Sequence, residues 1–148
     1  MARVRGFKEE DAEVVAKLSN ANSHLFQFPH VTPEFLKNFT DHPKFQMFVI
    51  EECKRITGFC GVNFENPREA ELGPICVEEG KRSQGLGTML VNEIFQFLKP
   101  RNPEKIIIKV KASNMGGQKF FEKLGFEALS GDICCGEPAI LMGREYGL

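Results

Sequence analysis

The sequence contains no tryptophan and a single tyrosine, Tyr146, although it carries 14 phenylalanines. A buried core would therefore consist of phenylalanine and aliphatic side chains, with little phenolic chemistry available to a reacting site. No segment approaches the ~20 consecutive apolar residues of a membrane-spanning helix. The basic first residues are followed at once by the charged residues 8–11, so the apolar core of a secretory signal is missing. We therefore expect a soluble, cytoplasmic protein.

An excess of either charge is also missing. Nineteen basic and twenty acidic residues give a net charge of −1, which offers no reason to expect a nucleic acid or a membrane as partner. Internal repeats and low-complexity linkers are absent as well. With 148 residues, of which 42% are hydrophobic, the chain can bury one sizeable core. We expect a single domain over residues 1–148.

Paired cysteine motifs are absent. No two cysteines have C-x-x-C spacing and none lies near paired histidines, so the sequence predicts no metal site. An odd number of cysteines without a secretory signal is typical of reduced thiols in the cytoplasm. The five are Cys53, Cys60, Cys76, Cys134 and Cys135.

What the sequence does contain is a glycine-bearing turn, residues 82–88, between an apolar strand pattern at 72–77 and a helical pattern at 86–98. The first N–H groups of a helix have no intrahelical partner and lie at the positive end of its dipole, where they favour a phosphate. Gly85 and Gly87 carry no Cβ, so a pyrophosphate could approach the main chain closely. The turn predicts a phosphorylated ligand.

Two common phosphate motifs match this turn poorly. A P-loop ends in Gly-Lys-Ser/Thr, but here Gly87 is followed directly by Thr88. A dinucleotide fingerprint needs a third glycine, where this sequence has Leu90, and it follows a first strand rather than lying in mid-chain. A nucleotide-binding domain that uses the same turn for ATP-like phosphates stays as the weakest of three interpretations.

The pattern Arg-x-x-Gly-x-Gly at residues 82–87 resembles the pyrophosphate loop of the GNAT superfamily of acetyl-CoA-dependent N-acetyltransferases. A second GNAT-like signature follows at the usual distance: Asn114 after a β-branched strand, then a helix, then Gly125 and Phe126. Asn114 suits the N-cap of that helix, and Gly125 suits its left-handed C-terminal position. The two signatures cover about residues 70–130.

The resemblance implies an α/β (mixed α+β) fold: one GNAT-like domain whose mostly antiparallel mixed sheet has a splayed strand pair and about four flanking helices. The hydrophobic pattern predicts the order β-α-α-β-β-β-α-β-α-β-β, which is the GNAT order. Its predicted strands cover residues 3–7, 45–52, 56–64, 71–77, 106–110, 126–129 and 139–143. Its first predicted helix starts near residue 8. The other three predicted helices cover residues 34–40, 86–98 and 115–124.

The resemblance also implies a site for acetyl-CoA as co-substrate, without a metal. Gly73 and Pro74 interrupt the strand that ends at residue 77, and they predict the bulge that splays this strand in the family. Its main chain would then pair with the pantetheine arm. The implied cofactor-binding residues are Ile75, Cys76, Val77, Arg82, Ser83, Gln84, Gly85, Leu86, Gly87, Thr88, Asn114 and Phe121.

Glu71 falls where histone-acetylating members of the family keep a general-base glutamate. Strict alternation from Val77 would place Glu71 on the same face as Ile75, and Glu69 and Glu65 are weaker candidates. Many relatives have a tyrosine seven residues after the motif asparagine to protonate the leaving thiolate. Here that position is Phe121, which has no proton to donate. The substitute acids left open are Cys134, Cys135 and a histidine of the loop at 20–30, His24 or His30.

These observations predict transfer of an acetyl group from acetyl-CoA to a primary amine of an unidentified acceptor. The acceptor could be a small molecule or a protein amine, and the chain could be a monomer or a homodimer. The alternative, motivated by Phe121, is a regulatory acyl-CoA-binding GNAT-like domain with weak or no catalysis.

Overall fold

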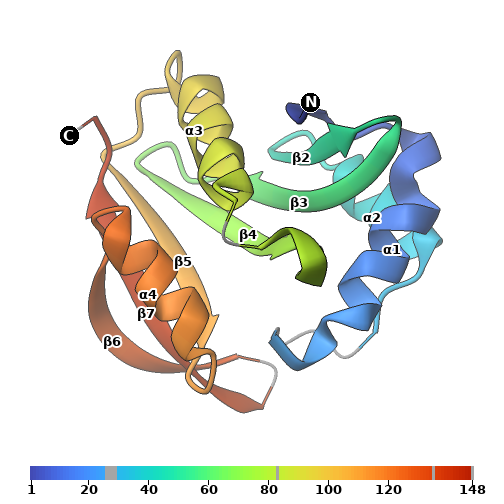
Figure 1. Ribbon diagram of the computed structural model, residues 1–148. Helices are drawn as coiled ribbons and strands as arrows, with labels where there is room; N and C mark the ends of the chain where they lie inside the picture. Colours follow the sequence, from blue (N-terminus) through green and yellow to red (C-terminus); the bar gives the residue numbers. More distant parts are fainter. Residues whose placement is uncertain (26–29, 83, 135, 148) are drawn as a thin grey trace.

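The computed structural model describes residues 1–25, 30–82, 84–134 and 136–147. Seven strands form one mixed sheet in the order β1-β2-β3-β4-β5-β7-β6 (Figure 1). Only β4 and β5 pair in parallel among the described strands. The strands are β1 (Arg3–Gly6), β2 (Phe45–Glu52), β3 (Arg55–Asn63), β4 (Glu69–Val77), β5 (Lys105–Lys111), β6 (Glu127–Cys134) and β7 (Glu137–Glu145).

Four α-helices are present in the described residues, and they follow the predicted order. They are α1 (Ala12–Ala21), α2 (Pro33–Thr40), α3 (Leu86–Leu98) and α4 (Met115–Lys123). Short 3-10 turns, η1 (Glu9–Asp11), η2 (Ser23–Leu25) and η3 (Glu79–Lys81), precede or follow them. The single mixed sheet with about four flanking helices that the sequence led us to expect is confirmed. None of the helices in the described ranges is long and apolar enough to cross a membrane.

Local sequence explains where the helices begin and end. The Thr32 hydroxyl accepts a hydrogen bond from the Phe35 amide at 3.1 Å, and Pro33 takes the first helical position of α2. The Asn114 side chain caps α4 by accepting from the Gly117 amide at 2.9 Å. Gly125, with a φ of 91°, ends α4 in the left-handed conformation.

The helices cover the sheet from both sides (Figure 1). α3 and α4 pack on one face, and their core includes Leu90, Ile94 and Phe121 together with Ile106 and Ile108 of β5. α1 and α2 pack on the opposite face of the N-terminal strands, in a second core. We call these the α3/α4 face and the α1/α2 face. Val15, Ala16, Leu36, Phe59 and Cys76 belong to the second core.

The predicted bulge is present in β4 and changes which residues share a face. Cys60 pairs with Ile75 and Val62 with Leu72, so Gly73 and Pro74 of β4 stand opposite Gly61 alone. Leu72 and Ile75 therefore both contact the α3/α4 core. The expectation that Glu71 shares a face with Ile75 is wrong. The extra residue shifts the alternation by one, so Glu71 points to the α1/α2 face.

After the bulge, β4 and β5 separate. They pair only from Glu69 with Lys105 to Leu72 with Ile108. Within the described part of the chain, the remaining residues of both strands, up to Val77 and Lys111, have no strand partner across this gap, and Figure 1 shows the two strands spreading apart. The splayed pair that the resemblance implied is thus built on the Gly73–Pro74 bulge.

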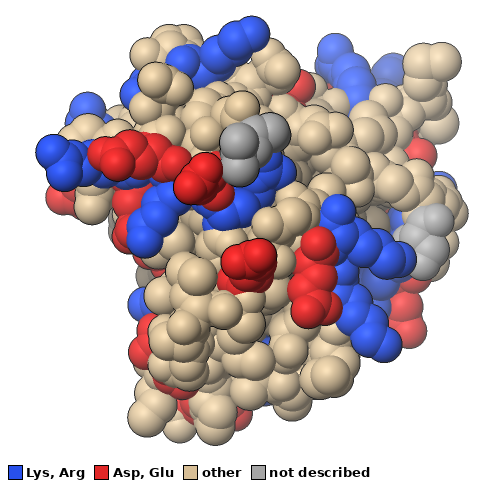
Figure 2. All heavy atoms as spheres, turned by 90° about the vertical axis from the view of Figure 1, so that its left-hand side faces the viewer, with Lys and Arg blue, Asp and Glu red and all other residues tan. Residues whose placement is uncertain are grey.

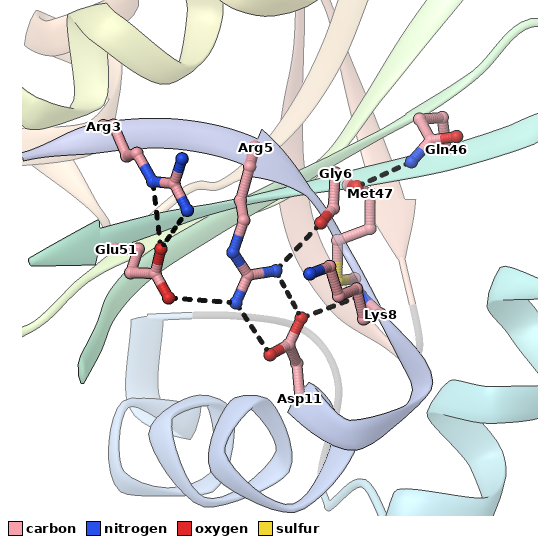
Figure 3. Close-up of polar contacts among 8 residues, drawn as sticks. All are labelled: Arg3, Arg5, Gly6, Lys8, Asp11, Gln46, Met47 and Glu51. Carbon is pink, nitrogen blue, oxygen red and sulfur yellow. Dashed lines mark hydrogen bonds and ion pairs between the residues drawn. The ribbon is translucent and has the colours of Figure 1, made fainter. Parts of the chain in front are cut away.

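An ion-pair network anchors the entry to α1 (Figure 3). The Arg5 guanidinium donates to both carboxylate oxygens of Asp11, at 2.8 and 3.0 Å, and the Lys8 amide donates to the same carboxylate at 2.7 Å. Glu51 of β2 lies 3.5 Å from Arg5 and accepts two hydrogen bonds from Arg3. The network joins β1, β2 and the start of α1 on the side away from the strand gap.

The main departures from the predicted elements lie at their ends. The helix expected from residue 8 starts at Ala12 after a 3-10 turn, because Asp11 is held by Arg5 and the Lys8 amide. β6 continues to Cys134, five residues beyond the predicted end at 129. Its residues are almost all exposed at the edge of the sheet, so the burial alternation that reveals a strand is weak there.

Candidate functional site

A large cavity occupies the gap between β4 and β5. Its volume is about 1160 Å³, and residues of both strands, the turn before α3 and α4 line it. Because no strand fills the gap beyond Leu72, the main chain of Gly73–Val77 borders the cavity along an unpaired edge. An extended ligand could pair with this edge as an additional strand would.

The cavity reaches both faces of the sheet. Ile75, Val77 and Val110 line it from the α3/α4 face, where they contact the core under those helices. Glu71 and Lys109 line it from the other face, since each alternates with residues of that core. A ligand bound over α3 and a second molecule on the α1/α2 side could therefore meet within the gap.

The turn before α3 presents an uncapped helix start to this cavity. Gly85 is the N-cap residue, with a φ of 80° and a ψ of 6°, and as glycine it has no side chain to satisfy the first N–H groups. The first turn of α3 also contains no acidic residue. Gly85, Leu86, Gly87 and Thr88 all line the cavity, so these amides are placed to meet an anion.

The remaining turn residues differ in their positions. Arg82 lines the cavity, and its side chain donates to the Val77 carbonyl at 3.0 Å and to the Asn22 side-chain oxygen at 2.5 Å. Gln84 is exposed and does not belong to the lining. Ser83 lies outside the described residues.

Asn114 lines the cavity at the start of α4, but its side chain has two protein partners. The oxygen caps α4 through the Gly117 amide, and the nitrogen donates to the Leu25 carbonyl at 3.5 Å. We therefore expect Asn114 to shape the cavity wall and to hold Leu25, itself a lining residue, rather than to contact a ligand through a free amide.

Positive charge dominates the lining. Six Lys and Arg side chains contribute to it against one carboxylate, Glu71, among the described residues. On the outer face seen in Figure 2, by contrast, basic and acidic side chains are interspersed. A cationic cavity in a chain of net charge −1 fits an anionic ligand. The six are Lys81, Arg82, Lys109, Lys111, Lys119 and Lys123.

Five of these cations, all except Arg82, were not among the predicted site residues, and Lys81 directly precedes Arg82 in the chain. Lys109 and Lys111 alternate with apolar residues on β5, and Lys119 and Lys123 are four residues apart on α4. Both spacings place each pair on one face of its element, and this signal could have been used. Lys111 also forms an ion pair with Glu137 at 3.1 Å, and Lys109 approaches Asp132 at 3.9 Å.

Phe121 contributes to the lining but is only 1% exposed. Its ring packs edge-on against Phe120 and Phe126, with centroids 5.0 and 5.2 Å away. The only tyrosine, Tyr146, does not belong to the cavity lining. Its hydroxyl donates to the Phe95 carbonyl at 2.6 Å, and burial raises its pKa. Neither ring supplies a phenolic proton to the cavity.

The candidate thiols and imidazoles give no clear substitute acid. Cys76, which was not one of the predicted acids, also lines the cavity, but burial raises the pKa of its thiol to about 12, against the opposing charge of Arg82. Cys134 lines the cavity near its β6 end, and Cys135 lies outside the described residues. His24 and His30 are exposed and do not line the cavity. In the described parts of the chain, no three His, Cys, Asp or Glu side chains could hold a metal ion together.

The sequence matches the acetyltransferase (GNAT) family over residues 13–126, which confirms the resemblance drawn from the two signatures. A proposed ribosomal protein bS18-alanine N-acetyltransferase of Bacillus subtilis (strain 168) is 24% identical over 126 residues. These cover 85% of this chain and 81% of that protein.

Solved structures share the fold over nearly the whole chain. Ard1 from Thermoplasma volcanium has a TM-score of 0.85 at 19% identity, with 97% of each chain covered. Spermidine N-acetyltransferase from Vibrio cholerae, in complex with CoA and spermine, has a TM-score of 0.81 at 17% identity. There 98% of this chain and 95% of that chain are covered.

Proposed function

Since the chain belongs to the acetyltransferase (GNAT) family, we propose that it transfers an acetyl group from acetyl-CoA to a primary amine. The observation that carries the proposal is the cavity in the β4–β5 gap, which joins the uncapped start of α3 to Glu71 on the opposite face. The six cations of the lining suit the phosphates of the cofactor. The unpaired edge Gly73–Val77 suits its amide-bearing arm.

In the proposed reaction, a neutral amine attacks the thioester carbon, the C–S bond breaks, and an amide and a thiol form. Glu71 would accept the proton of the ammonium, directly or through a water molecule, because it is the single carboxylate of the described lining. Main-chain N–H groups on the unpaired edge of β4 would stabilise the developing oxyanion. With Phe121 in place of a tyrosine, the leaving thiolate would take its proton from water.

The charges on the α1/α2 face affect which kind of amine acceptor can reach Glu71. Lys109 and Lys111 line the cavity on the same side as Glu71, so a polycation would meet repulsion on its way to the carboxylate. We therefore propose an acceptor with a single amine, such as a protein N-terminus, over a polyamine. A cytoplasmic location and a monomeric or homodimeric state stay predictions.

Calorimetry with acetyl-CoA, CoA and ATP tests the cofactor. The proposal expects acetyl-CoA and CoA to bind, with an affinity that falls as salt is added, and expects ATP to bind much more weakly. Tight ATP binding without CoA binding would favour the nucleotide-binding interpretation instead.

Thiol release over an amine panel tests the reaction. The panel should include a peptide with an N-terminal alanine and spermine, because one relative is named for an alanine acceptor and another was crystallised with spermine. A lysine peptide adds a second kind of protein amine. Acetyl-CoA binding without thiol release for any amine would favour the alternative, a regulatory acyl-CoA-binding domain, for which the buried Phe121 is the motivating observation.

A further inference from the structure

The segment after α1 crosses the open end of the β4–β5 gap. We call residues 22–25 the strap. Its position at the end of α1, beside the free ends of β4 and β5, is visible in Figure 1. Leu25 of the strap lines the cavity, so the strap forms part of the wall on the side where an acceptor would enter.

Both walls of the gap hold the strap. From the β4 side, Arg82 donates to the Asn22 side-chain oxygen at 2.5 Å. From the β5 side, the Lys111 ammonium donates to the His24 carbonyl at 3.3 Å and the Asn114 amide to the Leu25 carbonyl at 3.5 Å. At His24 and Leu25 the acceptors are main-chain carbonyls, which any residue at these positions would have. Asn22 is the strap residue whose own side chain makes the connection.

Asn22 is held firmly enough for its position to depend on that of Arg82. It is 5% exposed, and its side-chain nitrogen donates to the Leu18 carbonyl at 2.9 Å, which fixes the direction of its oxygen. Arg82 in turn is held by the Val77 carbonyl, the last residue of β4. A continuous path therefore runs from the strap through Arg82 to the turn before α3. A hydrogen bond that involves a charged group is among the stronger ones in proteins.

We infer that Asn22 is a positioning residue that couples the acceptor-side strap to the cofactor turn through Arg82. The inference rests on the proposed function, because it requires that acetyl-CoA binds at this turn. A bound anion restrains the turn and Arg82, and Arg82 then holds the strap in place through Asn22. By linkage, a strap held by an acceptor favours the bound cofactor to the same degree.

Hydrogen exchange of the strap amides, measured with and without saturating acetyl-CoA, tests this coupling. In the wild type, acetyl-CoA should slow exchange in residues 22–25 by ~10-fold, a coupling in the range typical of two linked sites. Asn22→Leu keeps the size of the side chain but removes the oxygen that accepts the hydrogen bond from Arg82. Saturating acetyl-CoA should then slow strap exchange by less than ~2-fold. Asn22→Asp keeps an oxygen for Arg82 and should retain the protection.

Two further variants separate coupling from a general loosening of the segment. Asn20→Leu breaks two 2.9 Å hydrogen bonds with Val31 but leaves Arg82 untouched, so the acetyl-CoA-dependent protection should persist. Arg82→Gln removes the donor of the hydrogen bond to Asn22. Because Arg82 is exposed, this change removes no core packing and tests the coupling even if Asn22→Leu does not fold. It should abolish the protection by acetyl-CoA.

The outcomes are distinct. Protection lost in Asn22→Leu or Arg82→Gln, and kept in Asn22→Asp and Asn20→Leu, supports the inference. If acetyl-CoA binds but leaves strap exchange unchanged, or protects it equally in Arg82→Gln, the coupling is overturned while the proposed function stands. If calorimetry shows that the wild type does not bind acetyl-CoA, the proposed function itself fails.

Discussion

Gly87 of α3 lies directly against the ring of Phe120 of α4: a Cβ added at Gly87 would stand 3.0 and 3.1 Å from two of its ring carbons. The second glycine of the turn therefore allows α4 to approach α3, whatever ligand the turn holds. A substitution at Gly87 would disturb this packing and cofactor access together. Gly85 is the better position for a test, because its added Cβ has no atom of the described residues within 4 Å apart from those of its own chain neighbours.

Gly85→Ala should weaken acetyl-CoA binding by at least ~10-fold, since the methyl group would enter the space in which the main chain meets the phosphates. It should also cost about 1 kcal/mol of stability, because Gly85 has a φ of 80°. Gly136→Ala is the matched control. Gly136 has a φ of 81° and open space around its Cβ, but it does not line the cavity. Calorimetry should show weakened binding in Gly85→Ala alone.

Glu71→Gln should lower turnover by ~10²-fold with acetyl-CoA affinity unchanged, because the carboxylate is assigned to the amine. Glu69→Gln is its control. Glu69 lies two residues earlier on the same face of β4, forms an ion pair with Lys105 at 3.2 Å and does not line the cavity. Steady-state kinetics should show wild-type turnover in Glu69→Gln. Equal rates in both variants and the wild type would transfer the role of base to water.

Much of this architecture could be predicted from the sequence because local signals specify it. Asn114 and Gly125 mark the two ends of α4, and a run of β-branched residues marks β5. The Gly73–Pro74 bulge was also predictable, because a glycine and a proline rarely share a straight strand.

The consequences of these signals across the fold were harder to predict. The face of Glu71 depends on whether the bulge adds one residue, which only the pairing with β3 settles. The bond between Arg82 and Asn22 joins residues 60 positions apart, and neither residue type requires the other. Sequence patterns reveal elements and their ends, whereas contacts between distant elements depend on how those elements pack.

Acid should reveal the contribution of Asp11 to stability. Burial opposes ionisation of Asp11, but the hydrogen bonds from Arg5 and the Lys8 amide outweigh it and hold its pKa below the ordinary value of 3.8. A group whose pKa is lowered by folding stabilises the fold fully above its unfolded pKa. That stabilisation is lost as the pH falls towards the folded pKa. Wild-type stability should therefore fall below about pH 4 more steeply than that of Asp11→Asn.

At pH 7, Asp11→Asn should cost about 2 kcal/mol or more in urea unfolding, because the Arg5 charge, 17% exposed, would lose its nearer carboxylate and keep Glu51 at 3.5 Å. The control is Glu104→Gln, whose partner Arg68 is 83% exposed, and which should cost less than about 0.5 kcal/mol. If the free energies of unfolding of the wild type and Asp11→Asn fall equally steeply as the pH is lowered, the prediction is contradicted.

Phe121→Tyr adds a hydroxyl at the position where the resemblance to the family implied a tyrosine. Phe121 and Phe126 are both at most 2% exposed and touch each other, but only Phe121 contributes to the cavity lining. A hydroxyl at Phe121 that reaches the cavity can be hydrated, so stability should change by less than about 1 kcal/mol. Phe126→Tyr, the control, would bury its hydroxyl in the core and should cost about 1 to 3 kcal/mol.

If unassisted departure of the thiolate limits the reaction, the new hydroxyl should raise turnover by up to ~10²-fold, the lower end for a positioned acid. Steady-state and single-turnover rates with the best amine of the panel measure this effect. Unchanged rates in a stable Phe121→Tyr variant would mean that amine deprotonation or product release is slower than thiolate departure. A loss of stability equal to that of Phe126→Tyr would mean that the hydroxyl is held in the core. Phe121 would then be a packing residue, and the thiolate would leave without help from this position of α4.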